Sequence, residues 1–157
     1  MGRQFERMPS TYSNKGEEDL RDHILLVLEP RFQGSATGET FNKTGKTDIL
    51  LRFEGKNVFI AECKFWNGIK LFFETISQLL AYLTWRDSKA AVIIFVKNKD
   101  FTSVLNTVKS EISNHPNYLG YQDEKEETWL NYRFHLIDDT NREVKLAVLL
   151  FHIPTPS

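Results

Sequence analysis

Cysteine is almost absent from this chain of 157 residues, in which Cys63 is the only one. A single cysteine excludes an intramolecular disulfide and any zinc cluster that needs several thiolates. Long apolar runs are missing as well: residues 1–16 are polar and mixed in charge, unlike a signal peptide, and no other segment has the length and apolarity of a membrane span. Together these absences predict a reducing, cytoplasmic setting and no membrane partner.

An excess of charge of either sign is also missing. The chain has 20 Lys and Arg against 21 Asp and Glu, a formal net charge of -1, whereas a nucleic-acid-binding domain is expected to be strongly basic. A nucleic acid would therefore be held by a local patch or with the help of other domains. The length fits one globular domain with a substantial core, and we predict a loose arm over residues 1–15 and the domain over residues 16–157.

Two short strands joined by a turn are the feature on which the functional prediction rests. Residues 48–53 and 57–64 are rich in β-branched and aromatic side chains, and the sequence Glu-Gly-Lys between them is typical of a turn. A three-residue loop places Asp48 across from Glu62, and the alternation of a strand puts Lys64 on the same face as Glu62. Two carboxylates and an ammonium would then meet at one edge of the sheet.

The rest of the chain alternates between helical and strand patterns. A continuous apolar run at residues 90–96 predicts an interior strand, parallel to the strand before the intervening helix. The acidic residues 120–128 predict an exposed loop. In chain order the predicted elements are helices at 17–30, 69–86 and 101–113 and strands at 48–53, 57–64, 90–96, 132–137 and 143–153. The order α-β-β-α-β-α-β-β predicts an α/β fold with a mixed sheet flanked by helices.

Polar residues on two of these helices are further candidates. Glu17 lies on the apolar stripe of its helix, one turn before Leu20, so it is either a charge at the helix start or a site residue. Gln78 and Tyr82 are four residues apart on one flank of the helix at 69–86. The alternative for these two is a boundary position with hydrogen bonds to the backbone.

This set of residues resembles a known signature. Asp48 followed by Glu62-Cys63-Lys64 on the next strand is similar to the motif of the PD-(D/E)xK nuclease superfamily, which has the restriction-endonuclease-like fold. Gln78-Leu79-Leu80-Ala81-Tyr82 looks like the Q-x-x-x-Y motif of its RecB-like branch, and Glu17 matches a helical glutamate of the family's metal site. Thr47 stands where the eponymous motif has proline. The resemblance covers roughly residues 16–96.

The resemblance implies hydrolysis of phosphodiester bonds with Mg²⁺ or Mn²⁺. Hard oxygen ligands suit these ions, and the reaction needs a positioned water and charge stabilisation on the phosphate. By resemblance Lys64 orients or helps to deprotonate the water, and Gln78 positions the water or the phosphate. The implied catalytic residues are Asp48, Glu62, Lys64 and Gln78, and the implied metal ligands are Glu17, Asp48, Glu62 and the main-chain carbonyl of Cys63.

The expected partner is nucleic acid, most of all DNA, and the expected setting is bacterial or phage defence or repair. Because the chain is nearly neutral, a homodimer or a larger multidomain protein would supply the additional contacts that hold the nucleic acid. Binding should weaken steeply as the salt concentration rises. The candidate nucleic-acid contacts are Lys43, Lys46, Lys70, Tyr82 and Arg86.

Several alternatives stay open at this stage. The same fold can serve as a non-catalytic module that binds nucleic acid or protein, with Asp48, Glu62 and Lys64 in surface salt bridges. An RNA-directed hydrolase would use the same metal site. Cys63 fits a packed small side chain better than a nucleophile. The four histidines are too scattered for a His-metal site, and no Ser-His-Asp order is present.

Overall fold

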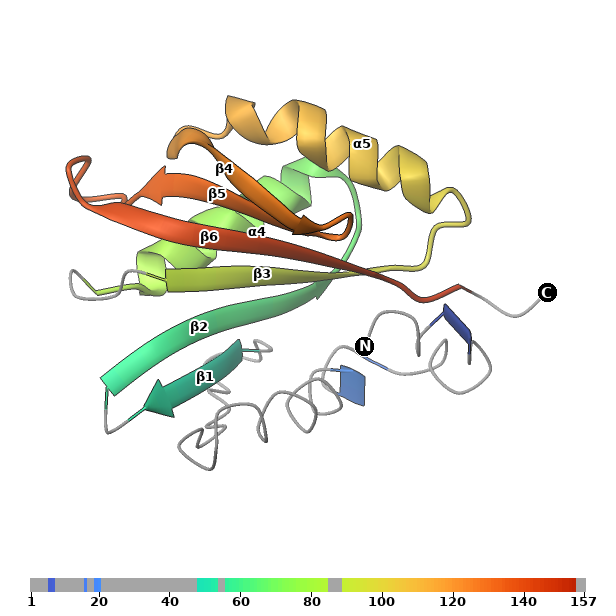
Figure 1. The fold of residues 1–157 in the computed structure, drawn as a ribbon, viewed down its shortest axis with the longest axis horizontal. Coiled ribbons are helices and arrows are strands. Elements are labelled where there is room, and N and C mark those ends of the chain that lie inside the picture. Colours follow the sequence, from blue (N-terminus) through green and yellow to red (C-terminus); the bar gives the residue numbers. More distant parts are fainter. Residues whose placement is uncertain are drawn as a thin grey trace.

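The computed structural model describes residues 6–7, 16, 19–20, 48–53, 56–84 and 89–154. Their core is a six-stranded mixed sheet with the spatial order β1-β2-β3-β6-β5-β4 (Figure 1). The strands are β1 (Asp48–Phe53), β2 (Lys56–Phe65), β3 (Lys89–Val96), β4 (Tyr118–Glu126), β5 (Trp129–His135) and β6 (Glu143–His152). The helices are α4 (Ile69–Tyr82), α5 (Phe101–Glu111) and the 3-10 turn η2 (Ile112–Asn114). The predicted α/β class with a mixed sheet is confirmed.

The interior of the sheet is parallel. β3 runs parallel to β2 on one side and to β6 on the other, and every residue of β3 after Lys89 is buried. This explains its continuous run of Ala, Val, Ile and Phe, because a strand covered on both faces has no solvent side to carry polar residues. The predicted β-α-β arrangement with parallel strands is therefore confirmed.

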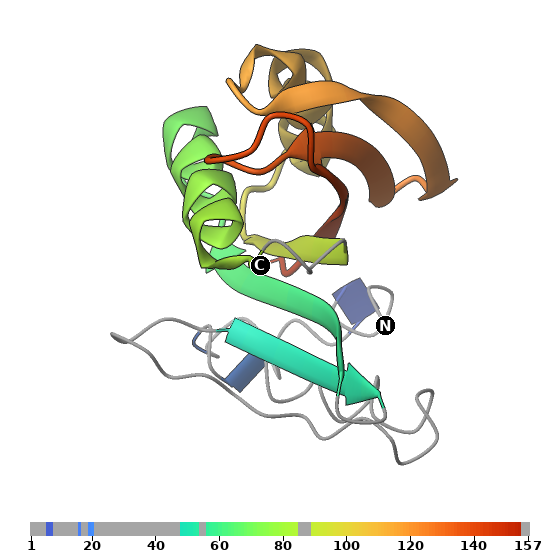
Figure 2. The ribbon, with the colours of Figure 1, turned by 90° about the vertical axis from the view of Figure 1, so that its left-hand side faces the viewer.

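Alternation along β3 divides the core into two layers. One face of the sheet packs against α4 and α5, whose Ile76, Leu79 and Val108 join Val92 and Ile94 in the larger cluster. Figure 1 and Figure 2 show both helices on the same side of β3. The opposite face carries a smaller cluster in which Leu20 packs with Ala61, Cys63 and Phe95. Leu20 belongs to the apolar stripe of the helix predicted at 17–30, most of which lies outside the described residues.

Two predictions about the chain after β2 need correction. The acidic segment 120–128 is not a loop: its first part belongs to β4, which pairs antiparallel with β5 at the edge of the sheet. The helix predicted to reach residue 86 ends at Tyr82, because Leu83 turns to extended backbone with ψ 141°. The hairpin predicted from 132–137 and 143–153 is confirmed as β5 and β6. No helix in the described part of the chain has the length and apolarity to cross a membrane.

Candidate functional site

The hairpin of β1 and β2 brings Asp48 opposite Glu62, as the sequence predicts. The route to this register differs from the prediction. Phe53 pairs with Lys56, so the connection is one residue shorter than expected, and a bulge near Leu51 restores the register by giving β2 one extra residue. The shorter connection and the extra residue at the bulge cancel each other. The pairing of Asp48 with Glu62, on which the site depends, is therefore the one predicted.

Glu62 is a buried carboxylate. Only 2% of its surface is exposed, and it is the only buried acid among the side chains that the structure describes. Its backbone lies between Asp48 on β1 and Val92 on β3. A carboxylate at such a position is costly unless charge or hydrogen bonds compensate it. The alternative of a salt bridge on a solvated strand edge therefore does not describe Glu62.

Strand alternation puts Lys64 on the same face as Glu62, the face that α4 covers. Ile60, two residues before Glu62, belongs to the cluster beneath α4, whereas Ala61 and Cys63 belong to the cluster on the other face. Lys64 is half-buried, which fits an ammonium near the end of a strand with its stem packed on apolar neighbours. The observed strand β2 therefore agrees with the predicted placement of Glu62 and Lys64 on one face.

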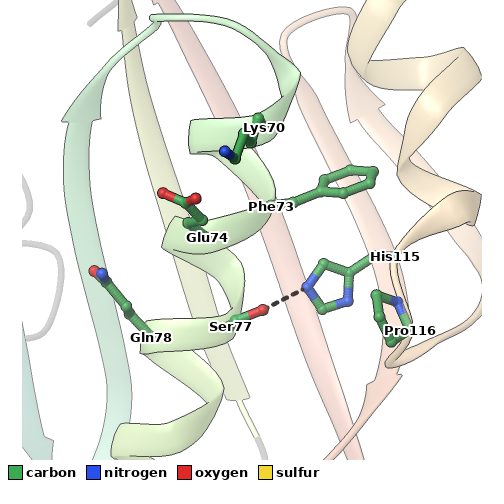
Figure 3. Close-up of a pocket in the computed structure, with 7 residues that line it drawn as sticks. All are labelled: Lys70, Phe73, Glu74, Ser77, Gln78, His115 and Pro116. Atoms are coloured by element: carbon green, nitrogen blue, oxygen red, sulfur yellow. Dashed lines mark hydrogen bonds between the residues drawn. The ribbon is translucent and has the colours of Figure 1, made fainter.

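Helix α4 follows β2 directly and carries the next candidate. It begins after Gly68, whose φ of 97° allows the sharp change from strand to helix. Gln78 is exposed, and in Figure 3 it points to the opposite side of α4 from His115. Tyr82, one turn later, is half-buried. The two residues of the Q-x-x-x-Y motif thus share one flank of α4, one exposed and one packed, in line with their spacing.

The other candidates divide into those that the structure describes and those that it does not. The Cys63 side chain is fully buried on the face opposite Glu62, so only its main-chain carbonyl remains as a candidate ligand. Lys70 is exposed on the outer side of α4. Glu17, Lys43, Lys46 and Arg86 lie outside the described residues. Of Asp48 the structure describes the backbone and its pairing. Where side chains are described, no three His, Cys, Asp or Glu residues gather into a metal-binding group.

A serine and a histidine missed by the sequence analysis meet beside α4. Ser77 Oγ lies 2.9 Å from Nε2 of His115, across a separation of 38 residues that no local pattern reveals. The backbone N–H of Asn117 donates to Nδ1 of the same ring over 3.0 Å. Because Nδ1 accepts, the ring proton sits on Nε2, and Ser77 accepts from it. This tautomer cannot remove a proton from Ser77, so the pair is not a nucleophile with its base.

Comparison with known proteins adds no relative. No protein-family model matches the chain, and neither the curated proteins nor the solved structures contain a match. The function is therefore argued from the geometry of the hairpin and α4 alone.

Proposed function

We propose that the protein is a divalent-metal-dependent nuclease of restriction-endonuclease-like fold that hydrolyses phosphodiester bonds, most of all in DNA. The observation that carries the proposal is the pairing of Asp48 with a buried Glu62 on adjacent strands, with Lys64 on the same face as Glu62. Cross-strand neighbours have Cβ atoms roughly 5 Å apart, so two such carboxylates can share one cation.

The donor set fits Mg²⁺ or Mn²⁺. Asp48 and Glu62 offer hard carboxylate oxygens, and the carbonyl of Cys63 follows Glu62 directly along β2. Glu17 is a proposed further ligand. A bound cation would supply positive charge to the phosphate oxygens as negative charge builds on them.

The remaining roles belong to the side chains around the carboxylates. Lys64 brings a positive charge to the face that carries Glu62, where it orients the attacking water and offsets charge on the phosphate. Gln78, with an amide that both donates and accepts, holds the water or a phosphate oxygen. Tyr82 packs one turn later and keeps that flank of α4 in place. Lys43, Lys46, Lys70 and Arg86 are proposed contacts to the nucleic-acid backbone.

Cleavage of a supercoiled plasmid and of a labelled single strand tests the proposal. Each substrate is incubated with Mg²⁺, Mn²⁺ or EDTA and with wild type, Lys64→Ala or Lys89→Ala. Lys89 is the matched control, because it is an exposed lysine at the other end of the parallel strands. We expect metal-dependent cleavage that Lys64→Ala lowers by about 100-fold or more and that Lys89→Ala leaves unchanged.

The opposite result is equally informative. Folded wild-type protein that cleaves neither substrate with any metal would contradict the proposal and favour a non-catalytic binding module. Equal cleavage by wild type and Lys64→Ala would show that Lys64 takes no part in the reaction. Competition with an RNA strand of the same sequence separates a deoxyribonuclease from an RNA-directed hydrolase.

A further inference from the structure

The three parallel strands end at one edge of the sheet. β2 ends at Phe65, β3 at Val96 and β6 at His152, and in Figure 1 these ends lie together on the right-hand side. Backbone hydrogen bonds tie the ends to one another: Trp66 N donates to Phe95 O, and Ile153 N donates to Val96 O, each over 2.8 Å. The carboxyl edge of a parallel sheet is where ligands bind in open α/β folds.

A cavity opens at this edge beyond the proposed catalytic residues. Its volume is about 420 Å³, and it is lined by Phe65, Trp66, Asn67, Lys97 and Asn98. That volume lies within the range of small-molecule pockets. The walls combine two aromatic rings, two amides and one ammonium, all from the residues at which β2 and β3 end.

The aromatic and cationic groups of the cavity are held in place by packing. The Phe65 ring packs against Phe95 with centroids 5.8 Å apart, and the Nζ of Lys97 lies 4.6 Å from the centroid of the Phe65 ring. Trp66 packs against Phe72 of α4 with centroids 5.9 Å apart. Both rings are only partly buried, so each retains surface for a ligand.

From this arrangement we infer that the cavity binds one unpaired nucleotide of a nucleic-acid strand, with the base against Trp66 and the phosphate on Lys97. The inference rests on the proposed nuclease function, because it takes the bound nucleic-acid strand to be the substrate of that nuclease. Trp66 continues the alternation of β2 and shares the α4 side with Lys64. A base seated on Trp66 therefore lies on the side of the sheet that carries the proposed site, and the cavity reaches across the ends of β2 and β3 to Lys97, which lies over the Phe65 ring of the opposite face.

The chemistry of the lining selects a nucleotide from an unpaired strand. A base offers a flat face for an aromatic ring and polar edges for the amides of Asn67 and Asn98, and its phosphate suits an ammonium. In a duplex the faces of each base are covered by its neighbours, so stacking on Trp66 needs a base that has left the helix.

The neighbouring charges leave this edge suited to an anion. Lys99 is exposed and adds a second ammonium, two residues after Lys97. Asp100 is the one acid nearby in the chain, and its carboxylate accepts the N–H of Ser103 at the start of α5 over 3.0 Å. His152 has its Nε2 3.0 Å from the carbonyl of Asn98. The sequence signal for this patch was the pair of lysines directly after the apolar run at 90–96.

Binding without catalysis tests the inference. The probe is a labelled oligo-dT of twelve nucleotides, and its fluorescence anisotropy is measured in EDTA over a range of salt concentrations. The proteins compared are wild type, Lys97→Ala and Lys89→Ala. Loss of one phosphate contact should weaken binding about fivefold at about 0.1 M salt and reduce the salt slope by about 0.7. Lys89→Ala, at the opposite end of β3, should bind as wild type does.

Substitutions at Trp66 test the stacking. Trp66→Leu should weaken binding of the single strand about tenfold, while Trp66→Phe, which keeps an aromatic face, should stay within about threefold of wild type. Thermal unfolding of each variant checks that the fold survives. A duplex of the same length should bind more weakly than the single strand to wild type, and Trp66→Leu should remove that preference.

The outcomes separate the inference from the proposed function. If wild type cleaves DNA but Lys97→Ala binds oligo-dT as Lys89→Ala does, the inference is wrong and the nuclease proposal stands. If binding depends on Lys97 and Trp66 but no metal supports cleavage, the nucleotide site stands and the nuclease proposal fails. Wild type that does not bind the single strand, or binds duplex equally well, overturns the inference.

Discussion

The buried imidazole of His115 gives the sharpest test of the structure. Only 3% of the residue is exposed, and Phe73 and Phe134 meet its ring edge-on with centroids 5.3 and 5.4 Å away. Burial lowers the pKa of His115 below its ordinary value of 6.5. A hydrogen bond with the backbone of Phe73 raises the pKa and so offsets part of this effect, and the nearby His135 lowers the pKa further. Protonation would also remove the lone pair that accepts the N–H of Asn117.

The sign and size of the effect follow from this lowered pKa. The unfolded chain binds a proton near pH 6.5, whereas the folded protein resists it. The neutral imidazole therefore contributes stability that is fully present above pH 6.5 and is lost as the pH falls toward the folded pKa. Within that window the free energy of unfolding should fall by up to about 1.4 kcal/mol per pH unit on account of His115.

Urea unfolding of wild type and His115→Gln between pH 8 and pH 5 measures this slope. Other histidines and the carboxylates titrate in both proteins, so the difference between the two curves isolates His115. A matched substitution, Ser77→Ala, keeps the histidine but removes the acceptor of its buried N–H, and should cost about 1–3 kcal/mol at pH 7.5. Parallel stability curves for wild type and His115→Gln would refute the buried, neutral imidazole.

Three further predictions concern the site and the two helices beside it. Glu62→Gln should abolish the rise in melting temperature that Mn²⁺ gives wild type, because one charged ligand is lost; an equal rise in both proteins would contradict the metal site. Gly68→Ala should cost about 1–3 kcal/mol in urea unfolding, because φ is 97° there and a Cβ would meet nothing within 4 Å, so the cost is backbone strain alone. Gly120→Ala is the control, since its backbone is unstrained and its added Cβ would meet only ordinary contact, and an equal cost would argue against strain. Asp100→Ala should cost about 1 kcal/mol by removing the acceptor for Ser103 N at the start of α5, and an unchanged urea midpoint would show that this cap adds nothing.

The parts of the fold that the sequence predicted are those set by local pattern. The two strands of the hairpin follow from their β-branched and aromatic residues, whereas the register of Asp48 against Glu62 agrees with the prediction only because a shorter connection and the bulge near Leu51 offset each other. The burial of β3 follows from its unbroken apolar run. The faces of α4 follow from helical periodicity, which correctly separates the buried Leu79 from the exposed Gln78. Each of these statements needs no knowledge of a distant segment.

The errors arise where a distant segment decides the structure. β4 is exposed at nearly every position and rich in acids, so it lacks the alternation that marks a strand, and pairing with β5 overrides its weak propensity. The bulge near Leu51 leaves one residue of β2 without a partner, which the alternation of side chains alone does not reveal. His115 and Ser77 meet only because η2 folds back beside α4. Lys97 was overlooked because its proposed role depends on where β2 ends in the same sheet.

The place of β6 has a consequence for how the protein is made. β6 lies between β3 and β5 but follows every other described strand along the chain. During synthesis, β1, β2 and β3 can assemble on one side and β4 and β5 on the other, each with an edge that only β6 can cover. Until β6 is in place, those two edges are open to pairing with other chains. A chain cut short before residue 143 would therefore have two incomplete sheets, with Glu62 and Lys64 on one of them and no β6 to join it to the other.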